Sequence, residues 1–113
     1  MEVELYHYHE DFIKACMDGE VELVKKFLAK PNLDPTYDQT VAFTSAVYMS
    51  RYDVVKLLLN DSRIDPRVRN NRALQMACNE IDKDHKMIEI LMADSRVAEL
   101  YNKDKDRIPY NIN

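Results

Sequence analysis

Apolar positions recur along the chain in the same order three times. The segments 23–28, 54–59 and 87–92 read LVKKFL, VVKLLL and MIEILM, with apolar residues at the first, second, fifth and sixth places. This i, i+1, i+4, i+5 spacing puts four side chains on one face of a helix. The pattern therefore predicts three helices, each with one buried face.

A shorter apolar segment precedes each of these helices. The three segments are DFIKACMDG (11–19), AFTSAVYMS (42–50) and ALQMACNE (73–80). In each of them a large apolar residue is followed three places later by alanine, which marks one buried edge of a short helix. The aligned pairs are Phe12 and Ala15, Phe43 and Ala46, and Leu74 and Ala77. Each unit is thus predicted to be a short helix, a tight turn and a longer helix.

An extended loop is expected after each longer helix. PNLDP (31–35) and SRIDP (62–66) both end in Asp-Pro, and the residue before proline is pushed away from helical geometry. Ile64 and Val97 occupy aligned places after Asp-Ser-Arg. We predict that these two β-branched residues begin hairpin strands.

The repeated motifs predict a single domain built of similar units. Residues 1–10 are predicted to form an N-terminal cap with an extra helical turn, and the repeats cover about 11–39, 40–70 and 71–106. Residues 107–113, RIPYNIN, look like the opening of a fourth unit. The chain is therefore either a piece of a longer array or a protein whose last unit lacks a covering neighbour.

The sequence resembles the ankyrin repeat family, whose units carry T-P-L-H-x-A and G-H-x-E-[IV]-V-K-x-L-L motifs. GEVELVKKFL (19–28), SRYDVVKLLL (50–59) and KDHKMIEILM (83–92) follow the second motif, and VAFTSA (41–46) and RALQMA (72–77) follow the first. The 31-residue period and the D-x-R-[IV]-D-P exit are also similar to the arrays of large DNA viruses and amoebae. The resemblance implies an all-α solenoid of helix-turn-helix units joined by hairpin-like loops.

The chain departs from the family pattern at its glycines and in its third unit. Asparagine stands where the family has glycine, at Asn60 and at Asn70 or Asn71, and we expect these residues to adopt left-handed conformations. The third unit also has two extra residues around Ile81 and Asp82.

Composition narrows the classes of function. Apolar residues make up 46% and charged residues 32% of the 113 residues, which is typical of a globular protein, and no apolar run approaches the length of a membrane span. The formal charge of −4 disfavours a nucleic-acid binder. Cys16 and Cys78 lie in apolar segments, which favours buried thiols in a reducing setting, the cytoplasm or alternatively the nucleus.

Catalytic and metal-binding motifs are absent, so the sequence predicts no enzyme, cofactor or metal site. His7, His9 and Cys16 are the strongest zinc candidates. Histidines two residues apart share a face only on a strand, however, so a tyrosine-rich cap is the favoured interpretation. The stretch 63–72 holds four arginines, which either contact phosphate or an acidic partner, or form a solvated hairpin whose charge Asp61 and Asp65 partly offset.

The resemblance implies protein–protein recognition through hairpin tips and the exposed side of the first helices. Tyrosine, arginine and methionine are enriched where binding energy concentrates. We therefore expect Tyr37, Tyr48, Met49 and Arg69 to form a central anchor cluster. The full set of expected contact residues is Tyr37, Asp38, Thr40, Tyr48, Met49, Arg69, Asn71, Asn79, Glu80, Lys105 and Arg107.

A second hypothesis is self-association. If no fourth pair of helices covers the third unit, Met76, Met87 and Leu91 would form an open apolar flank. Pairing of this flank with another copy would give a homodimer. The sequence does not identify a partner protein under either hypothesis.

Overall fold

The chain forms seven helices in a computed structural model that describes every residue except Met1, Glu80, Pro109, Asn111 and Asn113, and omits the side chains of 2–7. The described part of the chain contains no strand, so the all-α prediction is confirmed. The helices are α1 (Glu2–Asp18), α2 (Val21–Leu28), α3 (Tyr37–Tyr48), α4 (Tyr52–Leu59), α5 (Val68–Ala77), α6 (His85–Met92) and α7 (Ser95–Asp104).

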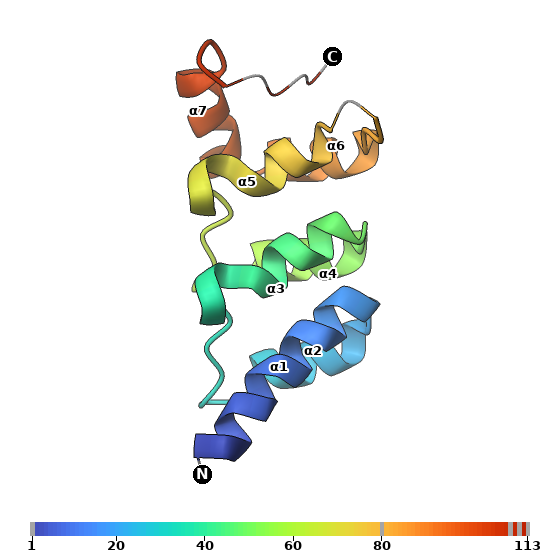
Figure 1. The fold of residues 1–113 in the computed structure, drawn as a ribbon, viewed down its shortest axis with the longest axis vertical. Helices are drawn as coiled ribbons and strands as arrows, with labels where there is room; N and C mark the ends of the chain where they lie inside the picture. Colours follow the sequence, from blue (N-terminus) through green and yellow to red (C-terminus); the bar gives the residue numbers. More distant parts are fainter. Residues whose placement is uncertain (1, 80, 109, 111, 113) are drawn as a thin grey trace.

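The helices stack in two layers along an elongated body of 47 × 22 × 20 Å. The first helices, α1, α3 and α5, form one layer, with α3 between the other two, and α2, α4 and α6 form the second layer behind it (Figure 1). We call the side with the inter-unit loops 29–36 and 60–67 and the starts of α3 and α5 the loop edge. We call the opposite side, where first helices turn into second helices at 19–20, 49–51, 78–79 and 81–84, the turn edge.

The core follows the repeating apolar pattern. Phe12, Phe43 and Leu74, from the first helices of successive units, are each at most 1% exposed. The alanines three places on are also buried, so the predicted buried edge of the first helices is confirmed. Leu23 departs from the pattern because it is 40% exposed. Its helix α2 stands at the end of the second layer, whereas α4 has a neighbour on both sides.

The N-terminal residues continue the first helix, because α1 runs without interruption from Glu2 to Asp18. Tyr8 lies on this extension, and its ring centroid is 5.2 Å from that of Phe27 in α2. His9 is 4% exposed. The extension therefore packs against the first unit.

Helix α7 replaces the third loop, which corrects two predictions. Ala98-Glu99 stand where the first two loops have Asp-Pro, so nothing breaks the helix there, and the Asp94 carboxylate accepts a bond from the Arg96 N–H at 3.0 Å. Val97 is consequently a buried helical residue and begins no strand. Ile64 is buried too, but in a loop, so its predicted strand is also wrong.

The left-handed conformations occur as three-residue turns at the starts of α3 and α5. Residues 38–40 have φ of 55° to 60°, and so do residues 69–71. The prediction is confirmed for Asn70 and Asn71 and wrong for Asn60, whose φ is −82°. Asn60 needs no left-handed cap because its N–H bonds to carbonyls within the last turn of α4.

The last unit is covered by the chain that follows α7, which passes over α5 (Figure 1). Tyr110 is 3% exposed, and Ile108 and Ile112 pack against the core. Met87 and Leu91 are fully buried. The prediction of an open apolar flank is therefore wrong for these two residues.

Candidate partner-binding surface

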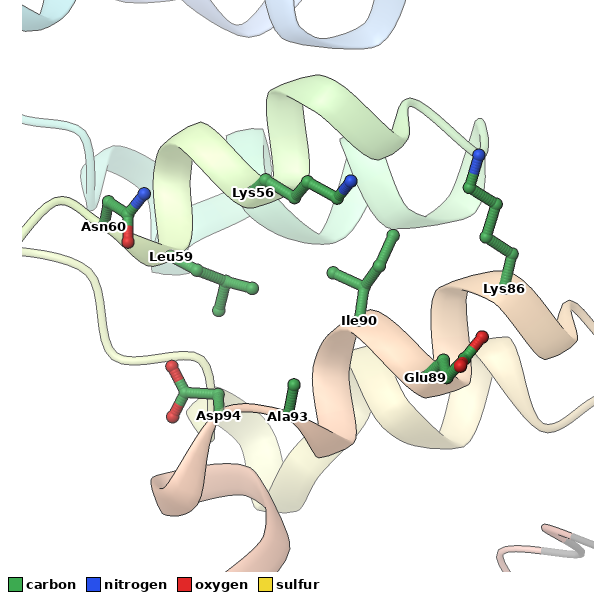
Figure 2. A pocket seen from close by; sticks show the side chains of 8 residues that line it. All are labelled: Lys56, Leu59, Asn60, Lys86, Glu89, Ile90, Ala93 and Asp94. Carbon is green, nitrogen blue, oxygen red and sulfur yellow. The ribbon is translucent and has the colours of Figure 1, made fainter.

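A hollow of about 640 Å³ lies between α4 and α6 in the second layer. Its apolar lining includes Leu59 and Ile90, and Figure 2 shows Lys56 of α4 extending along it toward Ile90. Lys86 lies on the other side, with its ammonium 4.6 Å from the Tyr52 ring centroid. Glu89 and Asp94 also line the groove. Because the lining carries both positive and negative side chains, its charge does not favour either anionic or cationic ligands.

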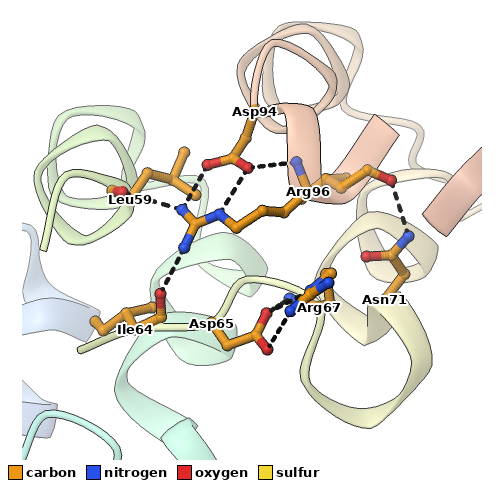
Figure 3. A network of polar contacts seen from close by, with 8 residues as sticks. Leu59, Ile64, Asp65, Arg67, Asn71, Asp94 and Arg96 are labelled. Atoms are coloured by element: carbon orange, nitrogen blue, oxygen red, sulfur yellow. Dashed lines mark hydrogen bonds and ion pairs between the residues drawn. The ribbon is translucent and has the colours of Figure 1, made fainter. Parts of the chain in front are cut away.

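The loop edge is held together by arginines that reach back to the preceding unit. Arg96 donates to the carbonyl oxygens of Ile64 at 3.0 Å and Leu59 at 3.3 Å (Figure 3). Its own unit orients it through an ion pair of 2.7 Å with Asp94. Leu59 ends α4, so this guanidinium satisfies a carbonyl that the helix leaves unpaired.

Arg63 repeats this arrangement one unit earlier. It donates to the carbonyl oxygens of Leu28 at 3.0 Å and Leu33 at 3.2 Å, and it pairs with Asp61 at 2.8 Å. Hydrogen bonds from Arg63 lower the pKa of the Asp61 carboxyl from its ordinary value, against an opposing effect of burial. The arginine of each Asp-Ser-Arg motif therefore links its unit to the preceding one, and we call these two sets of contacts the inter-unit braces.

The rest of the basic stretch is partly neutralised and partly exposed. Arg67 pairs with Asp65 at 2.9 Å and lowers the pKa of that carboxyl. Arg69 and Arg72 are exposed. The predicted offset of charge by Asp61 and Asp65 is confirmed.

Thr40 and Asn71 are removed from the expected contact set because they are only 3% and 0% exposed. The left-handed turns at the starts of α3 and α5 carry both residues into the interior. The Asn71 amide donates to the Val97 carbonyl oxygen at 3.2 Å. His9, Thr40 and Asn71 are spaced by 31 residues, so they are one position of the repeat, and all three are buried.

Two of the zinc candidates, His9 and Cys16, are buried in the first unit. The His9 Nε2 atom accepts a hydrogen bond from the Asp34 backbone N–H at 2.9 Å, and its ring stacks on Tyr37 at 4.8 Å. Cys16 is buried, which raises the pKa of its thiol to about 12. The side chain of His7 lies outside the described residues. Among those described, no three His, Cys, Asp or Glu side chains are grouped to hold a metal ion.

Most of the remaining expected contact residues lie at the surface. Tyr48 is 75% exposed and Met49 is 40% exposed. Tyr37 is half-buried, and Glu80 lies outside the described residues. The other exposed members of the set are Asp38, Arg69, Asn79, Lys105 and Arg107.

These surface residues do not form one anchor cluster. Tyr37 and Arg69 stand at the loop edge, and Tyr48 and Met49 stand at the turn edge. Tyr48 lies eight positions after Thr40 along α3, a rise of about 12 Å. The expected cluster is therefore corrected to two separate groups.

Two exposed apolar residues at the turn edge were missed. Met17 is 37% exposed and lies 31 residues before Tyr48, at the same position of the repeat. Ile81, on the two-residue insertion, is 97% exposed. Tyr48 and Ile81 line one hollow of about 270 Å³. The sequence showed the insertion as a break in the repeat. It gave no sign that the Ile81 side chain would be exposed.

Comparisons with known proteins agree with the architecture. Among the described residues, no helix combines the length and the apolar character needed to cross a bilayer. No curated protein and no solved structure matches the chain significantly. A family model of ankyrin repeats, in three copies, matches residues 12–104. This match covers most of the chain and agrees with its repeated words and stacked helix pairs, and the chain therefore belongs to the ankyrin repeat family.

Proposed function

We propose that this chain is a non-enzymatic recognition module that binds a partner protein through the turn edge and the exposed side of its first helices. Ankyrin repeats are generally protein–protein interaction modules. The observation that carries the choice of surface is the exposure of Tyr48, at 75%. A tyrosine left so open in water offers a large, rigid contact area.

The turn edge concentrates the exposed large apolar side chains of the described chain. Met17, Met49 and Ile81 lie there with Tyr48, one or two from each repeat. Leu23 is the only other one in the described residues, and it lies on α2. Exposed apolar side chains that gather in one region favour a protein interface.

Exposed charged residues at the starts of α3 and α5 and beyond α7 form the rim of the proposed surface. Asp38 and Arg69 occupy equivalent places in the left-handed turns of successive repeats, and both are exposed. Lys105 and Arg107 are exposed beyond α7. Charges at the rim of an interface mainly affect the association rate and the choice of partner.

The braces between repeats support this function by keeping the surface rigid. Arg63 and Arg96 bind the carbonyl ends of α2 and α4 at the loop edge. At the turn edge the Arg51 Nε atom donates to the Met17 carbonyl oxygen at 2.7 Å. A surface that is ordered before binding loses less entropy on association.

The cysteines favour a role without thiol chemistry. Burial raises the pKa of the Cys16 thiol to about 12 and that of the Cys78 thiol to about 11. Neither thiol is thereby poised as a thiolate nucleophile at neutral pH. Two buried, unpaired cysteines also fit a reducing compartment such as the cytoplasm or nucleus.

Affinity capture from a cell lysate tests the proposed surface. We expect partner proteins to be retained by the wild-type chain and lost by Tyr48→Ala, because this change removes the largest exposed apolar side chain of the turn edge without altering the core. Leu23→Ala is the matched control, since it removes an exposed apolar side chain from α2. Capture that survives Tyr48→Ala, at matched thermal stability, would contradict the proposal.

A further inference from the structure

A small hollow opens at the turn edge between the second and third repeats. Its volume is about 270 Å³, and residues from the end of α3, the end of α5 and the loop before α6 line it. Tyr48 and Ile81 contribute side chains that are 75% and 97% exposed. Val47, Met76 and Ala77 supply further apolar lining.

The hollow depends on the insertion that distinguishes the third repeat. The turns of the first two repeats pass from the first helix through Gly19 and Ser50, both with positive φ, directly into the second helix. The third repeat instead adds residues around Ile81 and Asp82 before α6 begins. The added residues place an isoleucine and a carboxylate beside Tyr48 of the preceding repeat.

The charge of the hollow is negative. Asp82 and Asp84 are the charged residues among those described as lining it, and Asp82 is exposed. Lys83 lies between them in the sequence but is not among those lining residues, and it is close enough to Cys78 to lower the pKa of that thiol slightly against the effect of burial.

Asp84 is held in place and ionised. It accepts hydrogen bonds from the Ser50 hydroxyl at 2.7 Å and the Tyr52 hydroxyl at 3.0 Å, both in the second repeat. Burial raises the pKa of Asp84, but hydrogen bonds from Ser50, the Met87 N–H and Tyr52 outweigh this effect and lower it. One wall of the hollow is therefore a fixed negative charge between two repeats.

We propose that this hollow receives a lysine or arginine side chain from an extended segment of the partner protein. The aliphatic stem would pack between Tyr48 and Ile81, and the cationic head would meet Asp82 and Asp84. This inference rests on the proposed function, because it names the chemistry that the turn edge recognises. Phosphate-bearing ligands and acidic segments are excluded, since the carboxylates would repel them.

Selection of a random 12-residue peptide library displayed on phage, with the wild-type chain as bait, tests the inference. We expect the retained peptides to share a lysine or arginine next to an apolar residue. Their synthetic versions should bind roughly tenfold more weakly to Asp82→Asn, which removes the charge but keeps the shape. Asp53→Asn is the matched control, because Asp53 is exposed at the start of α4 but does not line this hollow.

The outcomes separate the two proposals. Retained peptides that bind Asp82→Asn as tightly as wild type, or that share no basic residue, would overturn the basic-segment inference. If such peptides still lose binding in Tyr48→Ala, the turn edge remains the recognition surface. If no retained peptide depends on Tyr48, both proposals fail.

Discussion

At the scale of single residues, two arginines make contacts that a surface arginine ordinarily lacks. Arg63 and Arg96 each combine an ion pair within their own repeat with hydrogen bonds to two backbone carbonyls of the preceding repeat. Arg67 forms a similar ion pair with Asp65, but among the described residues its guanidinium donates only to that aspartate. Comparing Arg96 with Arg67 therefore separates the contribution of the inter-repeat hydrogen bonds from that of the ion pair.

Replacing Arg96 by alanine is expected to lower the free energy of unfolding by about 1–2 kcal/mol, because the carbonyl at the end of α4 and the loop carbonyl of Ile64 lose a charged donor. Arg67→Ala should lower it by much less than Arg96→Ala does, because an exposed ion pair contributes little to stability. Urea titration monitored by circular dichroism measures both changes. Equal effects of the two substitutions would mean that the inter-repeat bonds do not contribute.

The same pairs predict how stability depends on pH. Hydrogen bonds from their arginines lower the folded-state pKa of Asp61 and Asp94, against an opposing effect of burial. A lowered carboxyl pKa stabilises the fold above the unfolded value of about 3.9, and this stabilisation is lost as pH falls through the folded value. We therefore expect the free energy of unfolding to decrease as the pH is lowered below about 4.

Asp94→Asn provides the test of that assignment. The variant should be less stable than wild type at neutral pH and should lose less stability on acidification, because one depressed carboxyl is gone. Thermal unfolding at a series of pH values measures the slope. An identical slope in variant and wild type would show that Asp94 does not carry this dependence.

At the scale of elements, α7 shows how two residues decide between a loop and a helix. Asp-Pro at 34–35 and 65–66 keeps the first two exits extended, whereas Ala98-Glu99 permits helical hydrogen bonding. Asp94 then caps the new helix, and Val97 becomes part of its buried face. The two residues at this position after each second helix thus decide whether the segment forms a loop or a helix.

Glu99→Pro is expected to disrupt α7, because proline removes a backbone donor and clashes inside a helix, at a cost of about 3 kcal/mol. Far-UV circular dichroism should show lost helix, and the unfolding midpoint should fall. Glu99→Ala is the control, since Glu99 is exposed and alanine favours helix. Unchanged helix content in Glu99→Pro would contradict the account.

At the scale of the whole molecule, the stack is closed at its last repeat by the chain beyond α7. Tyr110 lies in the core there, and its hydroxyl donates to the buried carboxylate of Asp104 at 2.8 Å. The ring also meets Tyr101, with a centroid distance of 5.0 Å. This segment thereby removes apolar surface of the third repeat from water.

Tyr110→Phe should destabilise the chain by about 1–2 kcal/mol, because the buried Asp104 carboxylate loses its donor. The substitution should increase the rate of amide hydrogen exchange more in α5 than in α3. Tyr101→Phe is the matched control, as it removes the same hydroxyl from a half-buried neighbour. Equal exchange rates in the two variants would show that the Tyr110 hydroxyl does not secure the last repeat.

Much of the fold was predictable because burial follows helical spacing. Phe12, Phe43 and Leu74 recur at one position of the repeat, and all three are buried. The surface was harder to predict. Thr40 and Asn71 occupy positions that suggested exposure, but three-residue left-handed turns place them inside, and three left-handed residues in a row are rare outside glycine-rich segments.

The sequence by itself determined the repeat, the helix pairs, the identity of the core and the absence of catalytic motifs, because these depend on residue types at regular spacing. Only the tertiary structure decided that Arg96 braces two repeats, that Tyr110 closes the last one, and that Tyr48 and Ile81 meet across a hollow with carboxylates. The first and last of these features join residues 30 or more positions apart, and the geometry of all three depends on how the helices stack. The spacing of apolar residues within one repeat does not specify which residues of neighbouring repeats come into contact.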